Sequence, residues 1–424
     1  MSEKIAIIGG GAAGLMCACI ASDGGCDVTL FEKNRSERVI DSERAFDNAY
    51  LGKKLLITGK GRCNLTNDCS LDDFLSSVPT NSKFLYAAYN AFPPRKVMEY
   101  FESIGVPLKV ERGNRVFPVS DKSLDVLRAL KKVLAKNGVK VINKKISDIS
   151  SGEGFILKDE DGAEYRFDKC VVCTGGISYP QTGSDGDGYV FARKFGLSVT
   201  DTRPSLVPLV CEGTSFADVA GLTLKNVSLS IVDTEKKKTV FSKQGELLFT
   251  HTGISGPLVL AASSHMKDFS CGKYRADIDL KPALDEQTID ARLVSLFSLH
   301  GNKKLENALC EMLPKSMAAP FAKYCGSDPE MLTSFVTKQH RRAMCASFKK
   351  FSLKVLSLGS FSEAVVTSGG VSVKEIDPST MQSKKVSGLY FAGEVLDVDA
   401  YTGGFNLQIA FSTAYLAAKS LIGR

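Results

Sequence analysis

A short apolar run that ends in closely spaced glycines constrains this chain more than any other feature. The segment Ile5 to Ile8 is apolar throughout, and Gly9, Gly11 and Gly14 follow it with the spacing G-x-G-x-x-G. This pattern is typical of a buried parallel strand, a tight turn and a helix. The glycines let the backbone approach a ligand closely, and the free N–H groups at the helix start attract phosphate. The sequence therefore predicts a βαβ unit that binds a dinucleotide.

The acid expected of such a unit is also present. The segment Asp27 to Phe31 has the pattern of a second strand, and Glu32 follows it directly. A carboxylate about 20 residues past the last glycine can hydrogen-bond the adenosine ribose. A glycine motif alone is weak evidence, but the strand, the helix, the second strand and the acid together favour a dinucleotide site.

Composition places the chain among ordinary globular proteins. It has 424 residues, of which 44% are hydrophobic and 24% are charged, and this length predicts two or three domains. The net charge is +7, yet the basic residues are dispersed, and the densest cluster, Lys236 to Lys238, lies where a hairpin turn is expected. A solvated turn is the better interpretation of that cluster, so the composition argues against a nucleic-acid partner.

The twelve cysteines are unusual, but nothing marks them as bridged or metal-bound. The amino-terminal apolar stretch is interrupted by glycines and lacks a cleavage site, so we expect a cytoplasmic chain with reduced thiols. Cys170 and Cys173 form a C-x-x-C inside an apolar run, which favours a buried strand over a reactive pair. No metal site is predicted, and no run reaches the roughly 18 apolar residues of a membrane span.

Later segments that combine glycines with polar residues are expected to return to the dinucleotide. The segment Gly52 to Asn67 is rich in glycine and basic residues, with a glycine-rich surface loop as the alternative interpretation. Cys170 to Gly176 and Gly388 to Glu394 have the pattern of buried strands that end in glycine. Thr402 to Leu407 opens a last helix, Gln408 to Leu421, whose N-terminus would favour negative charge on a reduced flavin.

The first half of the chain also carries local signals outside these segments. Ser120 to Asn137 predicts a helix that is capped by Ser120 or Asp121 and closed by Gly138. An antiparallel meander is predicted from three further segments, Val139 to Ile149, Phe155 to Asp159 and Glu164 to Phe167.

The pattern changes from Pro204 onward. Short strands at regular spacing predict a separate antiparallel sheet or small barrel. Four short helices between Glu286 and Ala346 follow, and Phe351 to Leu358 is predicted to be a returning strand.

Several short sequence blocks follow one another along the chain, and their combined order identifies a protein family more specifically than any single block does. They include Gly52 to Asn67, Arg115 to Pro118, Phe249 to Pro257 and Tyr390 to Gln408. In these blocks the chain resembles the BaiN-type, aminoacetone-oxidase-like family of FAD flavoproteins. The resemblance implies an α/β fold with a discontinuous Rossmann-like FAD-binding domain at residues 1–197 and 357–424. It also implies an inserted antiparallel β-subdomain at residues 198–284 and 349–356 and a small helical subdomain at residues 285–348.

The resemblance further implies which residues contact FAD. Carried over position by position, the contacts fall on Gly9, Gly11, Ala12, Ala13, Gly14, Glu32, Lys33, Arg62, Cys63, Asn64, Gly175, Gly393, Glu394, Asn406 and Leu407. Two departures stand out. The segment from Asn34 to Leu51 is longer than in the family, and Ala400 and Phe405 replace the family's glycine and tyrosine near the flavin.

The resemblance implies an FAD-dependent oxidoreductase acting on a small-molecule substrate. Reduction of an activated C=C bond by NAD(P)H, of the bile-acid or steroid-enone type, is the leading hypothesis. Oxidation of a small amine by O2, a role in RNA modification or binding, and a merely structural FAD are the alternatives. No second G-x-G-x-x-G precedes a helix, so NAD(P)H would be a transient reductant. The sequence does not indicate an oligomeric state.

Catalytic side chains are less well defined than the cofactor site. By residue type and placement, the polar candidates near a cleft are His251, Thr252, Ser255, Tyr179 and Tyr401. Each of them has an alternative interpretation as an ordinary loop or turn residue.

Overall fold

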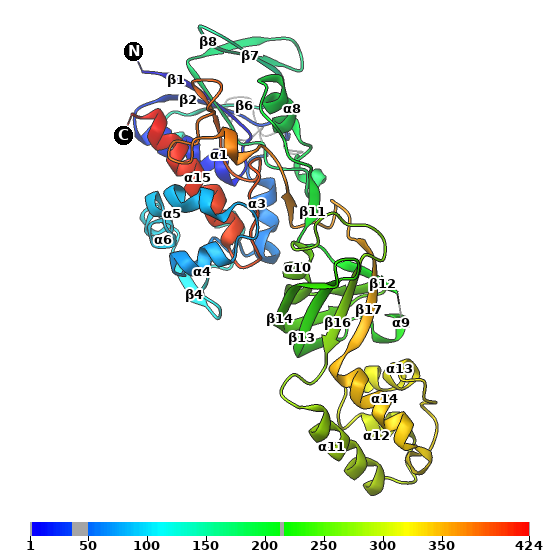
Figure 1. The fold of residues 1–424 in the computed structure, drawn as a ribbon. Coiled ribbons are helices and arrows are strands. Elements are labelled where there is room, and N and C mark those ends of the chain that lie inside the picture. The colour runs from blue at the N-terminus through cyan, green and yellow to red at the C-terminus, as the bar shows by residue number, and fades with distance from the viewer. Residues whose placement is uncertain (1, 36–49, 213–215, 424) are drawn as a thin grey trace. The chain divides into compact units, whose positions relative to one another are not determined.

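The chain folds into two units, described here from a computed structural model (Figure 1). The structure describes residues 2–35, 50–212 and 216–423. Unit 1 comprises Met1–Ser205 and Ala364–Arg424, and unit 2 is the continuous stretch Leu206–Glu363. Unit 1 is therefore built from both ends of the chain. Most of the longer segment from Asn34 to Leu51 lies outside the described residues.

A five-stranded parallel sheet organises unit 1. Its order is β19-β10-β1-β2-β6, with bounds β1 Lys4–Ile8, β2 Asp27–Phe31, β6 Lys140–Ile142, β10 Lys169–Val172 and β19 Leu389–Phe391. Ile8 is in register with both Phe31 and Val172, and Val172 is in register with Phe391. The carboxyl ends of these four strands therefore lie at one edge, as a doubly wound fold requires. The predicted Rossmann-like domain is confirmed.

Two helices from opposite ends of the sequence pack against each other on this sheet: α1 (Ala12–Asp23) and α15 (Phe405–Leu421) (Figure 1). Both are buried around most of their circumference, so they show little amphipathic pattern. α7 (Ser123–Lys136) has the ordinary amphipathic pattern and buries Val126 and Leu130.

Smaller elements complete unit 1. Three short antiparallel sheets have the orders β3-β5-β4, β7-β8-β9 and β11-β18. The bounds of the strands and helices are α3 Lys53–Ile57, β3 Thr66–Asn67, α4 Leu71–Ser76, α5 Tyr86–Ala91, α6 Pro94–Ser103, β4 Leu108–Glu111, β5 Arg115–Pro118, β7 Ile146–Gly152, β8 Gly154–Asp159, β9 Glu164–Phe167, α8 Asp187–Lys194, β11 Arg203–Ser205 and β18 Val366–Ser368.

Three local predictions for unit 1 were wrong. Val139 to Ile149 is not one meander strand, because its first part forms β6, which pairs in parallel with β2. α7 begins at Ser123 after Lys122, without a side-chain cap from Ser120 or Asp121. The last helix begins at Phe405, three residues earlier than predicted, because the glycine before it makes the turn.

Unit 2 contains a closed six-stranded barrel with the order β12-β15-β14-β13-β16-β17. The strands are β12 Leu209–Glu212, β13 Thr223–Asp233, β14 Lys238–Phe249, β15 Gly253–Ser255, β16 Tyr274–Asp279 and β17 Phe351–Leu358. Alternate residues of β16 are buried, as the two faces of a barrel strand require. The predicted antiparallel subdomain is confirmed, and Lys236 and Lys237 lie in the turn between β13 and β14 as predicted.

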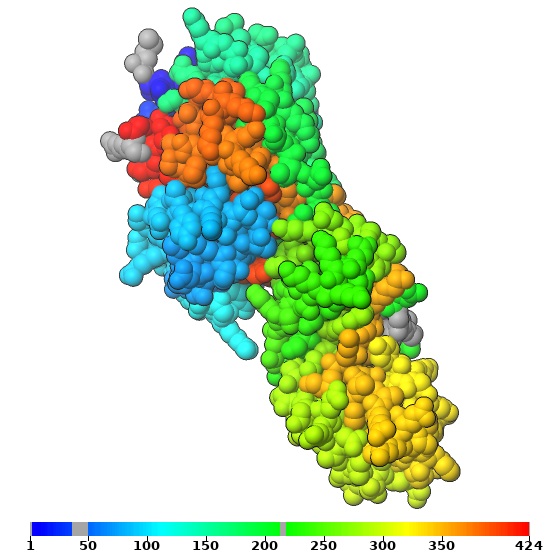
Figure 2. Space-filling model, in the orientation of Figure 1, coloured from blue at the N-terminus to red at the C-terminus, as the bar shows by residue number. Residues whose placement is uncertain are grey.

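Short helices cover one end of this barrel. They are α11 Glu286–Leu299, α12 Leu305–Leu309, α13 Lys315–Tyr324 and α14 Lys338–Lys349, while α10 (Pro257–Ser263) packs against β14 and α9 (Phe216–Val219) contacts α13. One apolar core runs from the barrel into these helices, and Figure 2 shows the yellow residues of the helices gathered at one end of the view. Among the described residues, no helix is long and apolar enough to cross a membrane.

Candidate functional site

The glycine loop at the start of α1 is closed toward the protein and open on one side. A Cβ on Gly9, whose φ is +104°, would lie 2.5 Å from the carbonyl oxygen of Cys173. A Cβ on Gly14 would lie 1.8 Å from the carbonyl oxygen of Gly9, whereas one on Gly11 would meet nothing within 4 Å. The first N–H groups of α1 have no side-chain cap. This is the shape that a pyrophosphate needs, with free donors and room at the middle glycine.

Glu32 lies where the ribose of a dinucleotide is expected. Its side chain is buried at the end of β2, where Oε2 accepts a hydrogen bond from the Gly10 N–H at 2.9 Å. Oε1 accepts from the backbone and side-chain nitrogens of Asn34, both at 2.7 Å. Burial raises the pKa of Glu32, and the hydrogen bonds from Asn34 and Gly10 oppose that rise. The carboxylate is thus held firmly beside the glycine loop.

The strands β10 and β19 bring two further glycine turns to the same edge. Gly175 and Gly393 follow these strands with φ of +73° and +81°. The N–H of Gly393 donates to Thr413 Oγ1 of α15 at 3.0 Å, and a Cβ on Gly393 would lie 2.8 Å from the Cβ of Ala13. The predicted contacts after β1, β2, β10 and β19 therefore meet at one edge of one sheet.

Glu394 connects three segments that are far apart in the sequence. One carboxylate oxygen accepts hydrogen bonds from Ser178 Oγ at 2.7 Å and from the Thr367 N–H at 2.9 Å. The other accepts from Lys54 Nζ at 3.2 Å, and Lys54 also donates to Ser178 Oγ at 3.0 Å. The sequence predicted Glu394 as a cofactor contact, but it did not show that Lys54, Ser178 and Thr367 would surround it.

Several buried polar atoms of unit 1 lack a hydrogen-bond partner among the described residues, and two of them belong to segments that are predicted to contact FAD or follow a strand of the parallel sheet. These two are Asn64 Oδ1, in a segment predicted to contact FAD, and Thr174 Oγ1, directly after β10. Buried polar groups are normally hydrogen-bonded, so a bound ligand would give these two atoms a partner. Together with the open side of the glycine loop, they show that the residues present fit an extended dinucleotide such as FAD.

Three predicted contacts have their side chains engaged elsewhere. Arg62 forms ion pairs with Glu111 and with Asp121, and its guanidinium lies 4.1 Å from the centre of the Phe117 ring. The Lys33 ammonium is ion-paired to the acids of the β10–α8 connection and the start of α8. Cys63 is fully buried, which raises the pKa of its thiol to about 12. Any contact of Arg62 or Cys63 with FAD would therefore use the backbone, and these contacts stay predictions.

The start of α15 is fixed by a tight polar turn. Asn406 Oδ1 accepts from the Ala400 N–H at 2.9 Å, and its Nδ2 donates to the carbonyl oxygens of Ala400 and Tyr401 at 2.7 and 3.2 Å. Gly404 precedes the helix with a φ of +101°. Leu407 lies in the first turn and is partly buried against the core of unit 1. The predicted contacts Asn406 and Leu407 thus lie at a helix N-terminus.

Sequence reasoning missed Asp399 on the loop between Glu394 and Asn406. Its side chain is 1% exposed, and Oδ2 accepts a hydrogen bond from Ser205 Oγ at 2.9 Å. The hydroxyl groups of Thr80 and Ser368 lie near the same carboxylate. Burial raises the pKa of Asp399, and neighbouring hydroxyl groups and Arg203 oppose that rise. The apolar pattern around this acid would have been the only signal in the sequence, since Asp is rarely buried without a role.

The candidate catalytic residues are divided between the two units. Tyr179 and Tyr401 belong to unit 1, and burial raises the pKa of Tyr401, with a further rise from Asp399. His251 and Thr252 are exposed in the turn between β14 and β15 of unit 2, and Ser255 ends β15. No group of metal ligands occurs among the described residues.

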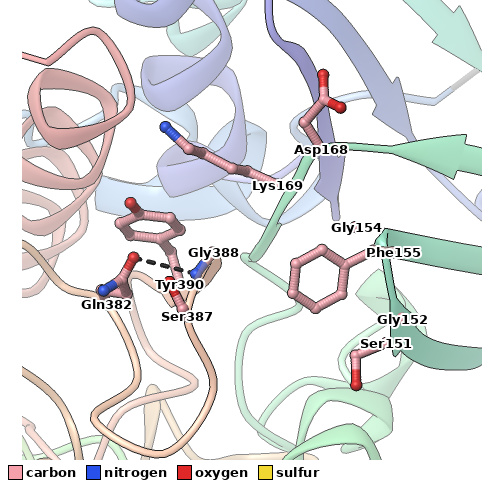
Figure 3. A pocket seen from close by; sticks show the side chains of 10 residues that line it. All are labelled: Ser151, Gly152, Gly154, Phe155, Asp168, Lys169, Gln382, Ser387, Gly388 and Tyr390. Carbon is pink, nitrogen blue, oxygen red and sulfur yellow. Dashed lines mark hydrogen bonds between the residues drawn. The ribbon is translucent and has the colours of Figure 1, made fainter.

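A pocket in unit 1 is lined by none of the predicted site residues. It has a volume of about 410 Å³ and is lined by Phe155, Lys169, Gln382 and Tyr390, among others (Figure 3). Lys169 begins β10, and Leu389 begins β19, so this pocket lies at the amino ends of the strands. Ligands of doubly wound folds bind at the carboxyl ends, and the pocket therefore adds nothing to the cofactor site.

Comparison with known proteins supports the same assignment. A family model described as "HI0933-like protein Rossmann domain" matches residues 3–420. The chain is 30% identical to ribosomal RNA dihydrouridine synthase from Escherichia coli, over 98% of this chain and 97% of that protein. A protein of the same name from Haemophilus influenzae is 30% identical over 99% and 98%. The 3-dehydro-bile acid delta(4,6)-reductase of Clostridium scindens is 29% identical, and all of both chains is covered.

Proposed function

The chain belongs to the HI0933-like Rossmann-domain family and is an FAD-dependent oxidoreductase, and from this premise we propose that it reduces a C=C bond conjugated to a carbonyl group. One observation carries the proposal. Relatives that match this chain over nearly its full length have different substrates, yet their names describe the same kind of reaction. A bile-acid delta(4,6)-reductase saturates double bonds of a steroid, and dihydrouridine is uridine with its C5=C6 bond saturated. In uracil, as in an enone, that bond is conjugated to a carbonyl.

Residues of unit 1 would hold the FAD that this reaction requires. When bound, FAD supplies the hydride that saturation of the bond requires. The glycine loop and the amino end of α1 would hold its pyrophosphate, and Glu32 its ribose. The chain offers one G-x-G-x-x-G loop, so NAD(P)H would reduce the flavin as a transient visitor. In the balanced reaction, NAD(P)H gives a hydride and solvent gives a proton to the two carbons of the double bond.

Stopped-flow mixing tests this proposal. We expect anaerobic NADH or NADPH to bleach the absorbance of the bound flavin, and a 3-keto-4-ene steroid or a uridine-containing RNA to restore it. Failure of both nicotinamides to reduce the flavin would rule out the reductase. Reduction of the flavin by a small primary amine in their place would instead favour the amine oxidase.

Asp399 is our candidate in unit 1 for the group that holds the proton in this reaction. It lies on the loop that joins the predicted contacts Glu394 and Asn406, and burial favours its protonated form. We expect Asp399→Asn to slow flavin reoxidation by the enone by about 10²-fold, since a positioned acid contributes at least that much. Flavin reduction by NADPH should not change. The control is Asp397→Asn on the same loop, because the Asp397 carboxylate accepts from Asn81 instead.

The pH dependence should follow from the same raised pKa. Because the folded protein binds this proton more tightly than the unfolded chain does, the contribution of Asp399 to stability is lost as pH rises from an ordinary carboxyl pKa through the raised one. Reoxidation by the enone should slow over the same window. Asp399→Asn should remove both trends, as measured by melting curves and stopped-flow traces across pH. A variant that keeps the wild-type pH profile would contradict this role.

A further inference from the structure

The helical subdomain of unit 2 carries exposed apolar and basic side chains on two neighbouring segments. We call this set of residues the basic face and define it by Leu299, Lys303, Leu332, Phe335, Lys338 and Arg342. We propose that the basic face binds RNA, with phosphates on its cations and an unpaired base on Phe335. This inference rests on the proposed function, since it names the class of molecule that presents the reducible bond.

Two chain segments hold the basic face in a fixed shape. The segment that follows α11 runs beside the one that precedes α14. The Thr333 N–H donates to the Lys303 carbonyl oxygen at 3.0 Å, and the Leu305 N–H donates to the Met331 carbonyl oxygen at 2.8 Å. The Thr337 hydroxyl then caps α14 by accepting from the His340 N–H at 3.2 Å. The backbone that carries these side chains is therefore held in place by hydrogen bonds.

The apolar members of the basic face are unusually exposed. Leu299 is 74% exposed and Phe335 is 68% exposed, the two highest values among the large hydrophobic side chains described. Leu332 is 36% exposed beside them. An exposed aromatic ring offers a flat surface on which a nucleobase can stack, and such stacking tolerates any base.

The charge of this face is one-sided. Residues 299–305 and 331–342 contain five Lys and Arg residues and no Asp or Glu. Lys304 pairs with Glu330 at 2.9 Å, and Arg341 pairs with Asp290 at 2.6 Å. Within the described chain, the other three cations, Lys303, Lys338 and Arg342, form no ion pair within 4.0 Å. The face therefore carries a net positive charge around an exposed ring, although Arg342 also acts on the Asp290 carboxylate.

RNA fits this combination better than a protein does. Lysine is depleted in the cores of protein–protein interfaces. Each lysine or arginine that contacts an RNA phosphate releases condensed counterions, which raises the affinity. Aromatic rings among basic residues are the usual device for single-stranded nucleic acid. Full-length relatives that are named for an action on ribosomal RNA agree with this choice of partner.

Fluorescence anisotropy of the FAD-loaded full chain with a labelled RNA stem-loop, whose loop is rich in uridine, tests the proposal. In the charge variant, Lys303→Glu, Lys338→Glu and Arg342→Glu are combined. We expect it to bind about 100-fold more weakly and to lower the slope of log K against log salt by about 2, because each lost phosphate contact removes about 0.7. Phe335→Ala should weaken binding about tenfold without changing that slope.

The matched control reverses the same number of charges elsewhere in unit 2. Lys236→Glu, Lys237→Glu and Lys238→Glu alter exposed residues at the β13–β14 turn. We expect this control to bind the RNA within about threefold of the wild type. Equal weakening by both triple variants would show general charge attraction and would overturn the proposal.

A second readout separates this proposal from the proposed function. Reduction of a small steroid enone by NADPH should be the same in the wild type and in all these variants. If the wild type reduces the enone but does not bind the RNA, the basic face has no such role and the proposed function stands. In another outcome, the wild type binds the RNA, the charge variant does not, and NADPH fails to reduce the flavin. The proposed function is then wrong, and the RNA-binding proposal stands. If Phe335→Ala changes only the molecular mass in light scattering, the face joins two copies of the chain and the RNA proposal is wrong.

Discussion

Gly11→Ala is expected to leave unit 1 folded and to weaken FAD binding by about a hundredfold, or about 2.8 kcal/mol. The backbone of Gly11 is extended, with φ of −79°, so alanine adopts it without strain. A Cβ there meets no protein atom within 4 Å. It would instead occupy the open side of the loop, where the backbone must approach the pyrophosphate. Flavin content after purification and titration of the apoprotein with FAD measure the effect.

Gly14→Ala provides the contrast. A Cβ at this position would lie 1.8 Å from the carbonyl oxygen of Gly9, a distance that no packing adjustment of side chains relieves. We expect this variant to lose folded unit 1 as well as flavin, as reported by circular dichroism and melting temperature. If Gly11→Ala retained FAD at wild-type affinity, the pyrophosphate would not lie against this loop.

Gly404→Ala is expected to destabilise unit 1 by about 3 to 5 kcal/mol. The φ of +101° costs alanine about 1 to 2 kcal/mol. The added Cβ would also lie 2.3 Å from the carbonyl oxygen of Thr66 in β3, so that α15 must move away from that strand. Because Asn406 and Leu407 begin the same helix, the flavin should be lost as well. Denaturant unfolding and flavin content measure the two effects.

Gly423→Ala is the matched control for that variant. Its φ of +75° is also left-handed, yet a Cβ there would meet nothing within 4 Å. We expect a loss of only about 1 kcal/mol, and no loss of flavin. Equal destabilisation by the two variants would mean that the contact between Gly404 and Thr66 does not matter.

The parts of the fold that could be predicted from sequence are those in which local pattern and tertiary role coincide. A strand buried on both faces has to be apolar, and a strand that ends at a phosphate has to end in glycine. Ile5 to Ile8 and Cys170 to Gly176 meet both conditions. Phe351 to Leu358, whose alternation fits a barrel wall, was predicted with its observed bounds.

The parts that could not be predicted depend on contacts between distant segments. Nothing local to Lys54 or Glu394 indicates that they pair with each other. Arg62 was expected among the FAD contacts, but Glu111 and Asp121 come close to its side chain only through the β4–β5 hairpin. The basic face was missed for the same reason, since its two segments each carry too few cations to form a recognisable cluster.

The division of unit 1 between the two ends of the chain has a consequence for synthesis. Unit 2 is continuous, and its barrel closes when β17 pairs with β12 and β16, so all of its strands leave the ribosome before unit 1 is complete. β19 and α15, which carry Gly393 and Asn406, emerge last. Since domains fold as they are made, the growing chain would pass through a stage with a folded insert and an unfinished Rossmann sheet. A ribosome that stalls shortly before Leu389 would therefore leave a nascent chain that cannot yet retain its flavin.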